Sequence, residues 1–382
     1  MTPMPTKPKP TLRTEELINE LQSFGVRLVD PSAGAASRRG GAGPSDHKAI
    51  TIDGMTVMAP VHTAPAFDSP YLVEKPDAFG RSRITRDGAV VAEASFPLGP
   101  KFYELSTAEG VPYRHIATLH GRDVLATTVL QTCIRYQSRT KTCQFCAIGQ
   151  SLAAGRTIAH KTPAQLGEVA EAAVRLDGVR HMVMTTGTPK GADRGAAVLA
   201  DSCVGVKARV NLPIQVQCEP PDDDAWFERL RTAGADALGM HLEAVSEPVR
   251  QRIMPGKATV SVERYFEAFA AAVPVFGRAQ VSTYILAGLG DTAEEILTVC
   301  ERLTALGVYP FVVPFTPISG TPLESHPTPP PAFMASILGP LARMLIASGL
   351  RSVDVKAGCA KCGACSSLAA YERGESACSS KR

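Results

Sequence analysis

No run of 18 or more apolar residues, the length that a membrane-spanning helix needs, occurs in this sequence of 382 residues. The first ten residues, Met1 to Pro10, alternate proline, lysine and threonine and lack the apolar core of a secretory signal. We therefore expect a cytoplasmic protein that has no membrane partner.

Charge of one sign is also scarce, since 40 lysines and arginines stand against 37 aspartates and glutamates. A formal net charge of +3, dispersed along the chain, is too small to indicate a nucleic-acid-binding surface. We therefore expect no nucleic-acid partner, and charge alone identifies no other.

Two early stretches have the composition of loops, being rich in proline, glycine, serine or alanine. Residues 1–13 are predicted to be a disordered start, and residues 31–46 (PSAGAASRRGGAGPSD) a loose loop. Between these stretches, Thr14 to Phe24 is predicted to form a short helix.

The next two segments alternate apolar and polar residues, and each is centred on an Asp-Gly pair. The pairs are Asp53-Gly54 and Asp87-Gly88, and this dipeptide between alternating segments is a strong signal for a β-hairpin. Residues 14–121 are therefore predicted to form the N-terminal helix and a small, mostly antiparallel β domain.

From Val124 onward, short β-rich runs alternate with longer helical patterns. We predict strands at 124–131, 181–186, 213–218, 236–242, 279–286 and 309–315, and helices near 162–176, 192–208, 222–233, 261–272, 292–306 and 331–348. This alternation is typical of βαβ units and a parallel sheet. The fold class is therefore α/β, with a partial (β/α)6 barrel of TIM type over residues 122–350 or, as the alternative, a doubly wound sheet. In both folds, chemistry belongs at the C-terminal ends of the strands.

Cysteine is the most informative residue type, because six of the ten cysteines fall into two tight groups. In a cytoplasmic chain of this length, such groups are more often metal or cluster ligands than disulfides. Of the others, Cys203, Cys218 and Cys300 stand singly in apolar stretches and are predicted to be buried and inert, and Cys378 is predicted to be free in a polar tail.

The first group is Cys133, Cys143 and Cys146, with spacing C-x9-C-x2-C, and it directly follows the first predicted barrel strand. Three thiolates hold three irons of a [4Fe-4S] cube and leave the fourth iron open, whereas a zinc site normally needs a fourth protein ligand. The nearest histidine downstream, His160, is 14 residues beyond Cys146. The pattern therefore favours the cluster, with zinc or thiols that bind no metal as the alternatives.

With Phe145 before the last cysteine, this pattern resembles that of the radical S-adenosylmethionine (radical SAM) superfamily. The usual spacing there is C-x3-C-x2-C, so the first gap is wider here, and we expect its basic residues Arg135, Arg139 and Lys141 to bulge outward. The resemblance implies that the first group binds a [4Fe-4S] cluster and that the open iron binds S-adenosyl-L-methionine (SAM).

The resemblance also implies SAM contacts at the ends of later strands. These residues are Thr186, Gly187, Thr188, Gln217, Glu219, His241, Glu243 and Gly288. An ordinary βα turn accounts equally well for the first three, and a hydrogen-bonded interior network for the polar residues on the third and fourth strands. No catalytic residue is assigned.

The second group, Cys359, Cys362 and Cys365, has the spacing C-x2-C-x2-C and lies in the C-terminal segment 351–382. This spacing occurs in ferredoxin-type cluster motifs and predicts a second [4Fe-4S] cluster, for which the nearby fourth cysteine is missing. Cys218 and Cys378 are the cysteines left to propose as fourth ligand, and a zinc knuckle is the alternative. Because the group follows a complete barrel, we expect it to fold over the barrel mouth.

These features resemble the biotin-synthase and lipoyl-synthase branch of the superfamily, and within it an uncharacterised radical SAM family whose genes lie beside a nitrilase and an acetyltransferase. The resemblance implies an enzyme that reductively cleaves SAM to a 5'-deoxyadenosyl radical and abstracts hydrogen from a small-molecule substrate. It also implies an electron donor such as flavodoxin or ferredoxin, and sulfur insertion or electron relay by the second cluster. The alternatives are a non-catalytic iron–sulfur electron-transfer or scaffold protein and a zinc-stabilised binding module.

Overall fold

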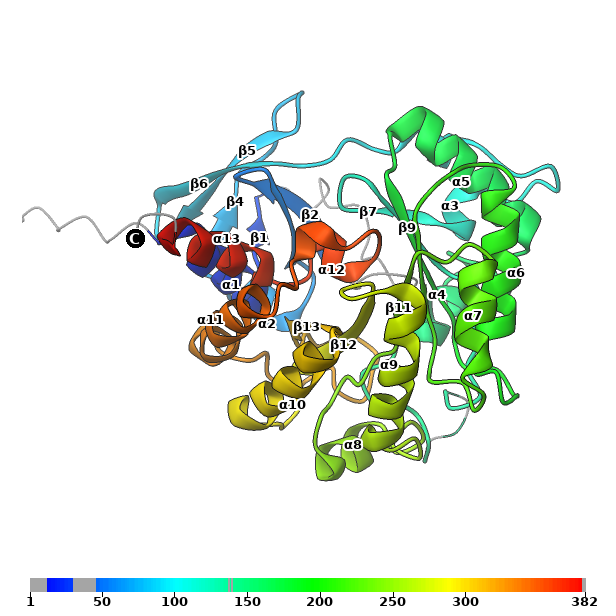
Figure 1. Ribbon diagram of the computed structural model, residues 1–382. Helices are drawn as coiled ribbons and strands as arrows, with labels where there is room; N and C mark the ends of the chain where they lie inside the picture. Colours follow the sequence, from blue (N-terminus) through cyan, green and yellow to red (C-terminus); the bar gives the residue numbers. More distant parts are fainter. Residues whose placement is uncertain (1–11, 30–45, 137, 139, 380–382) are drawn as a thin grey trace, which may run out of the picture.

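A six-stranded sheet forms the N-terminal part of the chain. The computed structural model describes residues 12–29, 46–136, 138 and 140–379 (Figure 1). The strands are β1 (Arg27–Leu28), β2 (His47–Ile52), β3 (Met55–Pro60), β4 (Tyr71–Val73), β5 (Arg81–Arg86) and β6 (Ala89–Ser95), in the order β1-β4-β5-β6-β2-β3. Only the short β1–β4 pair is parallel. Helix α1 (Thr14–Phe24) begins and ends where the sequence predicts and packs Leu17, Ile18 and Leu21 into the core of this sheet.

Both predicted hairpins are present. Asp53-Gly54 joins β2 to β3, and Asp87-Gly88 joins β5 to β6. All four turn residues have positive φ, from 48° to 81°, which is the geometry that type I′ turns require and that Asp-Gly supplies at low cost. Local turn chemistry therefore sets the register of this sheet. Most of the loop predicted at 31–46 and the start predicted at 1–13 lie outside the described residues.

A seven-stranded sheet forms the second part, and its strands follow one another in sequence order. They are β7 (Thr118–His120), β8 (Val124–Thr128), β9 (His181–Thr185), β10 (Ile214–Gln217), β11 (Ala237–Gly239), β12 (Val281–Ala287) and β13 (Tyr309–Pro314). Strands β8 to β13 are parallel, and β7 is an antiparallel edge strand beside β8. This is the predicted partial barrel, and it begins at β7, slightly before residue 122.

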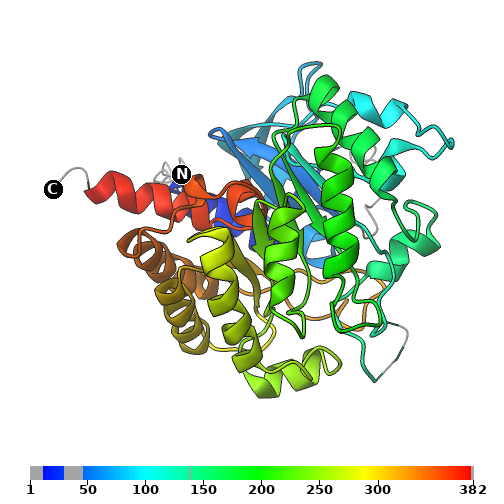
Figure 2. The same cartoon turned by 45° about the vertical axis from the view of Figure 1, so that its right-hand side comes forward.

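The predicted helices cover the outer face of this sheet (Figure 2). They are α5 (Pro163–Asp177), α6 (Ala196–Lys207), α7 (Ala225–Thr232), α9 (Val262–Phe276), α10 (Ala293–Leu306) and α11 (Pro331–Ala347). Thr162 and Thr292 start α5 and α10 with reciprocal capping boxes. Short elements that the sequence analysis did not predict are α2 (Ala64–Phe67), η2 (Lys101–Glu104), α3 (Tyr113–Ile116), α4 (Ile148–Ala153), α8 (Glu247–Ile253) and η3 (Ser352–Asp354). No helix within the described residues is long and apolar enough to cross a membrane.

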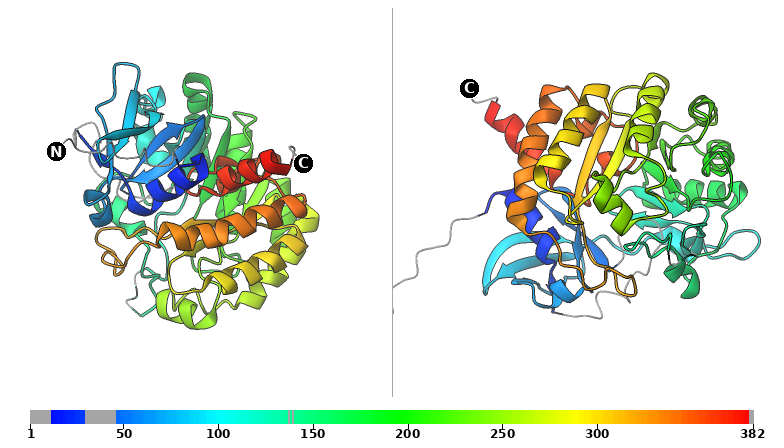
Figure 3. Two further views of the ribbon diagram at one scale, coloured as in Figure 1. Left: turned by 90° about the vertical axis from the view of Figure 1, so that its left-hand side faces the viewer. Right: turned by 90° about the horizontal axis from the view of Figure 1, so that it is seen from below.

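The C-terminal segment is a structured part of the fold. It contains α12 (Cys359–Cys362) and α13 (Leu368–Ser379), and α13 lies beside α11 and α1 (Figure 3). On α13, the buried Glu372 accepts hydrogen bonds from the hydroxyls of Tyr309 and Ser352. The predicted polar tail is therefore a helix for most of its length.

Residues 354–358 lie at the N-terminal ends of the barrel strands. The Gln280 side chain, just before β12, bonds the backbone of Asp354 and Lys356 at 3.0 and 2.9 Å. The Gly358 N–H donates to Nδ1 of His181, the first residue of β9, at 3.3 Å. The expectation that the second cysteine group folds over the C-terminal mouth is therefore wrong, because the segment enters the barrel from the opposite end.

The open side of the half barrel is closed by the tail and the N-terminal sheet. The Met58 N–H on β3 and the Gln22 side chain on α1 both donate to the Ala364 carbonyl, at 2.7 and 3.0 Å. Two residues further on, the Ser366 hydroxyl donates to the Val312 carbonyl on β13 at 2.6 Å. Residues 364–366 thus connect β3 to the edge strand β13, and the barrel interior is covered from the side.

Candidate functional site

The first cysteine group lies in a loop after β8 that backbone hydrogen bonds hold on two sides. On one side, Ile134 N–H donates to the Thr188 carbonyl at 3.0 Å, next to the end of β9. On the other, Gln144 N–H donates to the Ile253 carbonyl at 2.8 Å, at the end of α8. The loop therefore sits across the C-terminal ends of the strands.

The three thiols of this group are electrostatic neighbours. Burial raises the pKa of Cys146 to about 12, and the nearby Cys133 thiol acts in the same direction. Burial also raises the pKa of Cys143 well above its usual value, with smaller contributions from Glu243 and Cys146. The Cys143 and Cys146 thiols are therefore protonated at neutral pH unless a metal centre displaces their protons.

The donor set fits a cluster better than a single metal ion. Within the described residues, no group of three or more His, Cys, Asp or Glu side chains lies close enough to hold one metal ion. A cube spreads its cysteine ligands over separate irons and so accepts more widely spaced sulfurs than a tetrahedral zinc does. Three thiols with this spacing, which act on one another electrostatically, suit the cluster that the sequence predicts.

Arg135, from the gap between the first two cysteines of this group, points inward. Its buried guanidinium pairs with the buried carboxylate of Glu219, and the Thr188 hydroxyl donates to the same carboxylate oxygen at 2.8 Å. The other oxygen, Oε2, is buried and has no hydrogen-bond partner among the described residues. The expected outward bulge is therefore wrong for Arg135, although Lys141 is exposed, and Arg139 lies outside the described residues.

Glu243 and Lys257 form a buried ion pair beside the first group. Lys257 Nζ lies 2.8 Å from Glu243 Oε2, and both side chains are less than one-fifth exposed. Burial opposes the charge on Lys257, but Glu243 and other anionic neighbours outweigh it and raise the pKa of the lysine above its usual value. Lys257 is therefore charged at neutral pH.

The backbone holds Glu243 in an unusual conformation. Its φ is +65°, which is strained for a residue with a side chain. The Glu243 N–H donates to the Tyr284 carbonyl at 2.8 Å, which ties the residue to β12. The fully buried Arg250 donates to the carbonyls of Leu242 and Ala244, on either side of it. These contacts fix the carboxylate at the end of β11.

His241 lies two residues before Glu243 and is neutral. Burial lowers its pKa to about 3, and Lys257 acts in the same direction. Its Nδ1 accepts the Tyr284 N–H at 3.2 Å, so Nε2 carries the proton of the neutral ring. The imidazole thus offers a hydrogen-bond donor without a charge.

The predicted glycines each have a packing reason that is independent of any ligand. A Cβ on Gly187 would lie 2.1 Å from the Thr132 carbonyl oxygen in the first cysteine loop. Gly288 has φ +108°, and a Cβ there would press on the Pro329 ring at 3.0 Å. The Thr186 hydroxyl donates to the Gly187 carbonyl at 2.9 Å. SAM contacts at Thr186, Gly187, Thr188 and Gly288 remain a prediction.

The second cysteine group lies inside the barrel against the third strand. Cys359 N–H donates to Gln215 Oε1 at 3.2 Å, and Gln217 Nε2 donates to the Cys359 sulfur at 3.3 Å. Gly358 allows this approach, because a Cβ there would lie 2.1 Å from the Gln215 side chain. The structure therefore pairs Gln217, a predicted SAM contact, with the second group.

Two further side chains meet the second group from other strands. The hydroxyl of Tyr284, on β12, hydrogen-bonds the Cys365 thiol, and burial followed by the nearby thiols raises its pKa well above the usual value. On β7, His120 places Nε2 3.8 Å from the Cys365 sulfur. Polar side chains from β7, β10 and β12 thus contact the second group.

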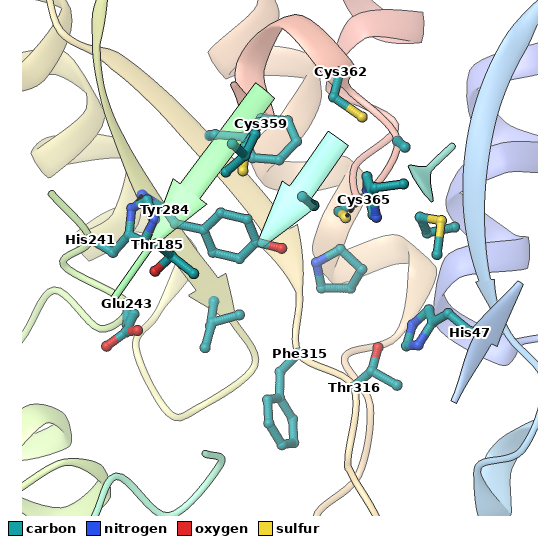
Figure 4. Close-up of a pocket in the computed structure, with 18 of the residues that line it drawn as sticks. His47, Thr185, His241, Glu243, Tyr284, Phe315, Thr316, Cys359, Cys362 and Cys365 are labelled. Carbon is teal, nitrogen blue, oxygen red and sulfur yellow. Dashed lines mark hydrogen bonds between the residues drawn. The ribbon is translucent and has the colours of Figure 1, made fainter. Parts of the chain in front are cut away.

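One cavity of about 360 Å³ is lined by the three cysteines of the second group (Figure 4) and extends to Phe145, in the loop of the first group, whose own cysteines do not line it. Phe145 and Glu243 line it beside the first group, and Cys359, Cys362 and Cys365 line it on the other side. The Tyr284 ring lies between Glu243 and the three thiols. Its remaining lining is Gln22, His47, Met58, His120, Val124, Ala126, Val183, Thr185, Gln217, His241, Leu286, Phe311, Pro314, Phe315, Thr316, Ile318 and Ala364.

Sequence reasoning missed four residues of this region: His120, Arg250, Lys257 and Tyr284. A period of two along β12 places Tyr284 on the same face as Ser282 and Leu286, so an inward-facing tyrosine was detectable. The other three have no local pattern that distinguishes them. Cys203, Cys218 and Cys300 are buried, as predicted. The side chain of Cys378 lies outside the described residues.

Sequence comparison identifies the class of protein. Residues 140–303 match the sequence profile of the Radical SAM superfamily, a segment that includes Cys143 and Cys146 and begins after Cys133. The chain therefore contains a radical SAM domain and belongs to that superfamily of enzymes.

Its relatives within the superfamily are distant. The chain is 32% identical over 120 residues to bacteriochlorophyllide c C-7(1)-hydroxylase of Chlorobaculum limnaeum, covering 31% of this chain and 30% of that one. It is 29% identical over 171 residues to lipoyl synthase of Geobacillus sp. (strain WCH70), covering 44% and 53%. The chain thus spans a third to a half of the length of these relatives. Among solved structures, methylornithine synthase is 18% identical with a TM-score of 0.46, over 67% of this chain and 75% of that one.

Proposed function

We propose that this protein is a radical SAM enzyme whose small-molecule substrate occupies the cavity between two iron–sulfur clusters. The supporting observation is that one cavity of about 360 Å³ has Phe145 and Glu243 at one side and three cysteine thiols at the other. Such a volume suits a small metabolite. A loaded first cluster would supply the electron that cleaves SAM to methionine and a 5'-deoxyadenosyl radical.

In this proposal, Cys133, Cys143 and Cys146 hold the first cluster, and the charged residues around them receive SAM. Glu243 Oε2 accepts a hydrogen bond from Lys257 Nζ, so Oε1 is left to accept a hydrogen bond from an ammonium or hydroxyl group. Glu219 Oε2 is a second buried acceptor without a partner among the described residues. A buried carboxylate oxygen without a hydrogen-bond partner is costly. The cationic and hydroxyl groups of SAM could supply such partners.

The composition of the cavity wall supports a proposal for the substrate class. Within the described residues, no lysine or arginine lines the cavity, whereas Val124, Val183 and Phe311 contribute an apolar wall. A multiply anionic substrate would lose its hydration there without a cationic partner. We therefore expect an uncharged or cationic molecule of low polarity, held by the Nε2–H of His241 and the hydroxyl of Tyr284.

In this proposal, the N-terminal sheet covers the open side of the cavity. Gln22, His47 and Met58 line the side of the cavity that the half barrel leaves open. They exclude water from the space in which a carbon radical would react, which protects such intermediates from side reactions.

Cys359, Cys362 and Cys365 hold the second cluster in this proposal, and the similarity to lipoyl synthase supports that assignment. Its position beside the substrate cavity suits either sulfur insertion or electron relay. A small electron-transfer protein such as flavodoxin or ferredoxin would reduce the first cluster. Six clustered thiols also require a reducing compartment, so we place the enzyme in the cytoplasm.

Anaerobic reconstitution of three variants tests the proposal. The variants change Cys133, Cys143 and Cys146 to Ala, change Cys359, Cys362 and Cys365 to Ala, or change the buried Cys203 and Cys300 to Ala as a control. We expect about eight irons per chain in the wild type and control, and about four in either triple variant. With SAM and dithionite, only the first triple variant should fail to produce 5'-deoxyadenosine.

Three outcomes would contradict the proposal. Formation of 5'-deoxyadenosine by the first triple variant would remove that group from the SAM site. A wild type that fills both clusters but neither binds nor cleaves SAM would support the iron–sulfur scaffold instead. A colourless protein that retains zinc would support the zinc-stabilised module.

A further inference from the structure

Lys161 is a buried cation whose hydrogen-bond acceptors are neutral. It lies just before α5 and is 1% exposed. Its Nζ donates to the Thr128 carbonyl at 2.6 Å and to Gln131 Oε1 at 3.3 Å. Burial lowers the pKa of Lys161 to about 7, and no carboxylate in the described part of the chain opposes that effect. A buried ammonium is costly when its acceptors are neutral, so Lys161 calls for an anionic neighbour.

Lys161 and Gln131 together connect the two ends of the first cysteine loop. Gln131 lies two residues before Cys133, and Ile148 lies two residues after Cys146. The Gln131 side chain accepts a hydrogen bond from Lys161 through Oε1, and its Nε2 donates to the Ile148 carbonyl at 2.9 Å. One chain of hydrogen bonds thus runs from the lysine to both ends of the loop that carries the first group.

Backbone hydrogen bonds fix the lysine relative to this loop. The Lys161 N–H donates to the Val129 carbonyl at 3.0 Å, and the Gln131 N–H donates to the Ala159 carbonyl at 2.8 Å. On the other side of Lys161, the capping box of Thr162 starts α5. The chain therefore holds the ammonium at the base of the first loop through its own hydrogen bonds.

We propose that Lys161 is a positioning residue for the first cluster, which connects the two ends of its loop through Gln131 and supplies a positive charge to it. This inference rests on the proposed function, because it requires a cluster at Cys133, Cys143 and Cys146. A cube held by three thiolates carries a net negative charge. It would provide the anionic neighbour of Lys161, raise the pKa of the lysine again and keep it charged.

Arg135 and Lys257, which also belong to the surroundings of the first group, differ from Lys161 in having carboxylate partners. Arg135 pairs with Glu219, and Lys257 pairs with Glu243. A carboxylate partner cancels much of the field of a cation, whereas the charge of Lys161 is left to act on the cluster. Reduction adds one negative charge to a cluster, so a nearby cation favours the reduced state. We therefore expect Lys161 to raise the reduction potential of the first cluster.

Three substitutions of Lys161 separate its charge from its hydrogen bonds. Lys161→Arg retains both, Lys161→Gln retains an N–H donor without the charge, and Lys161→Met removes both. The control is Lys207→Met, which removes a lysine on α6 whose Nζ lies 2.9 Å from Asp236. All four variants are made in the full chain and reconstituted with both clusters.

Redox titration followed by electron paramagnetic resonance tests the charge, with the second cluster as an internal reference. The signal that changes when SAM is added identifies the first cluster. Lys161→Gln and Lys161→Met should lower the reduction potential of the first cluster and leave that of the second unchanged. Lys161→Arg should retain the potential of the wild type, and Lys207→Met should shift neither cluster.

Hydrogen exchange in the iron-free chain tests the connection between the loop ends, and it does not require the variants to assemble a cluster. Peptides that contain Gln131 and Ile148 should exchange faster in Lys161→Met than in the wild type, Lys161→Gln or Lys207→Met. Gln131→Leu, which retains the charge of Lys161 and removes the link to Ile148, should also exchange faster.

Several results would overturn this inference and leave the proposed function in place. They are an unchanged potential of the first cluster in Lys161→Gln, a shift of equal size at both clusters, and the same shift in Lys207→Met. Unchanged hydrogen exchange in both Lys161→Met and Gln131→Leu would exclude the connection between the loop ends. A wild type that binds no iron at the first group would overturn both this inference and the proposed function.

Discussion

The two cysteine groups differ in the surroundings that the same barrel gives them. The first lies at the C-terminal ends of the strands, among the charged pairs Glu243–Lys257 and Arg135–Glu219. The second enters from the N-terminal ends and contacts the uncharged polar side chains of Gln217 and Tyr284. The charged end suits a charged cosubstrate, and the neutral end suits a cluster that faces an uncharged substrate. In the proposed enzyme, the barrel would thus separate two chemistries along its axis.

Breaking the charged pair should give the largest effect. Glu243→Gln leaves Lys257 buried without its partner, and we expect a loss of about 3–5 kcal/mol in the free energy of unfolding. Glu243→Gln combined with Lys257→Met should recover most of that stability, because no buried charge remains, but should not recover SAM binding. Denaturant unfolding and calorimetric SAM titration measure the two effects. Full SAM affinity in the double variant would show that the pair has only a structural role.

Two glycines allow each group to be disturbed separately. Gly187→Ala forces a Cβ against the Thr132 carbonyl in the first loop, and Gly358→Ala forces one against Gln215 beside the second group. We expect each to cost about 1–3 kcal/mol in unfolding free energy. Iron analysis should show depletion of the first cluster in Gly187→Ala and of the second in Gly358→Ala.

Gly99→Ala is the control for this pair, since its added Cβ has no heavy atom within 4 Å. It should leave both clusters filled. Loss of both clusters in each glycine variant would mean that the two groups fold as one unit and that the comparison between them fails.

Local features of the sequence were predictable, because they depend on neighbouring residues. The Asp-Gly turns, the helix at 14–24 and the alternation of strands and helices all follow from patterns a few residues long. The single cysteines were predicted to be buried because their neighbours are apolar, and they are buried.

Long-range contacts were not predictable in the same way. The inward turn of Arg135 depends on Glu219, 84 residues away, and the entry of the tail depends on His181, 177 residues before Gly358. No local pattern encodes such pairings. Sequence reasoning therefore identified both cysteine groups but placed the second at the wrong end of the barrel.

The free energy of unfolding should depend on pH through His181, which holds the tail just before the second group. Burial lowers the pKa of His181 to about 4, and its Nδ1 accepts the Gly358 N–H. Because the unfolded chain binds a proton near pH 6.5 and the folded chain does not, folding stability falls as pH decreases below that value. Between pH 6.5 and 5.5 we expect a loss of about 1 kcal/mol from this residue. Denaturant unfolding at both pH values should show a smaller loss in His181→Asn, and an equal loss would contradict the assignment.

The smallest effect concerns the hydrogen bond from Gln217 to the Cys359 sulfur, which lies 3.3 Å from the amide nitrogen. A donor to a cluster sulfur stabilises the more negative, reduced state, so Gln217→Leu should lower the reduction potential of the second cluster. A hydrogen bond of about 1 kcal/mol corresponds to about 40 mV for a one-electron couple. Redox titration should show this shift at the second cluster and none at the first. A shift of equal size at both clusters in Gln217→Leu would mean that Gln217 also contacts the first site, as its place among the predicted SAM contacts implies. The separation between the charged and the neutral end of the barrel would then not hold at this residue.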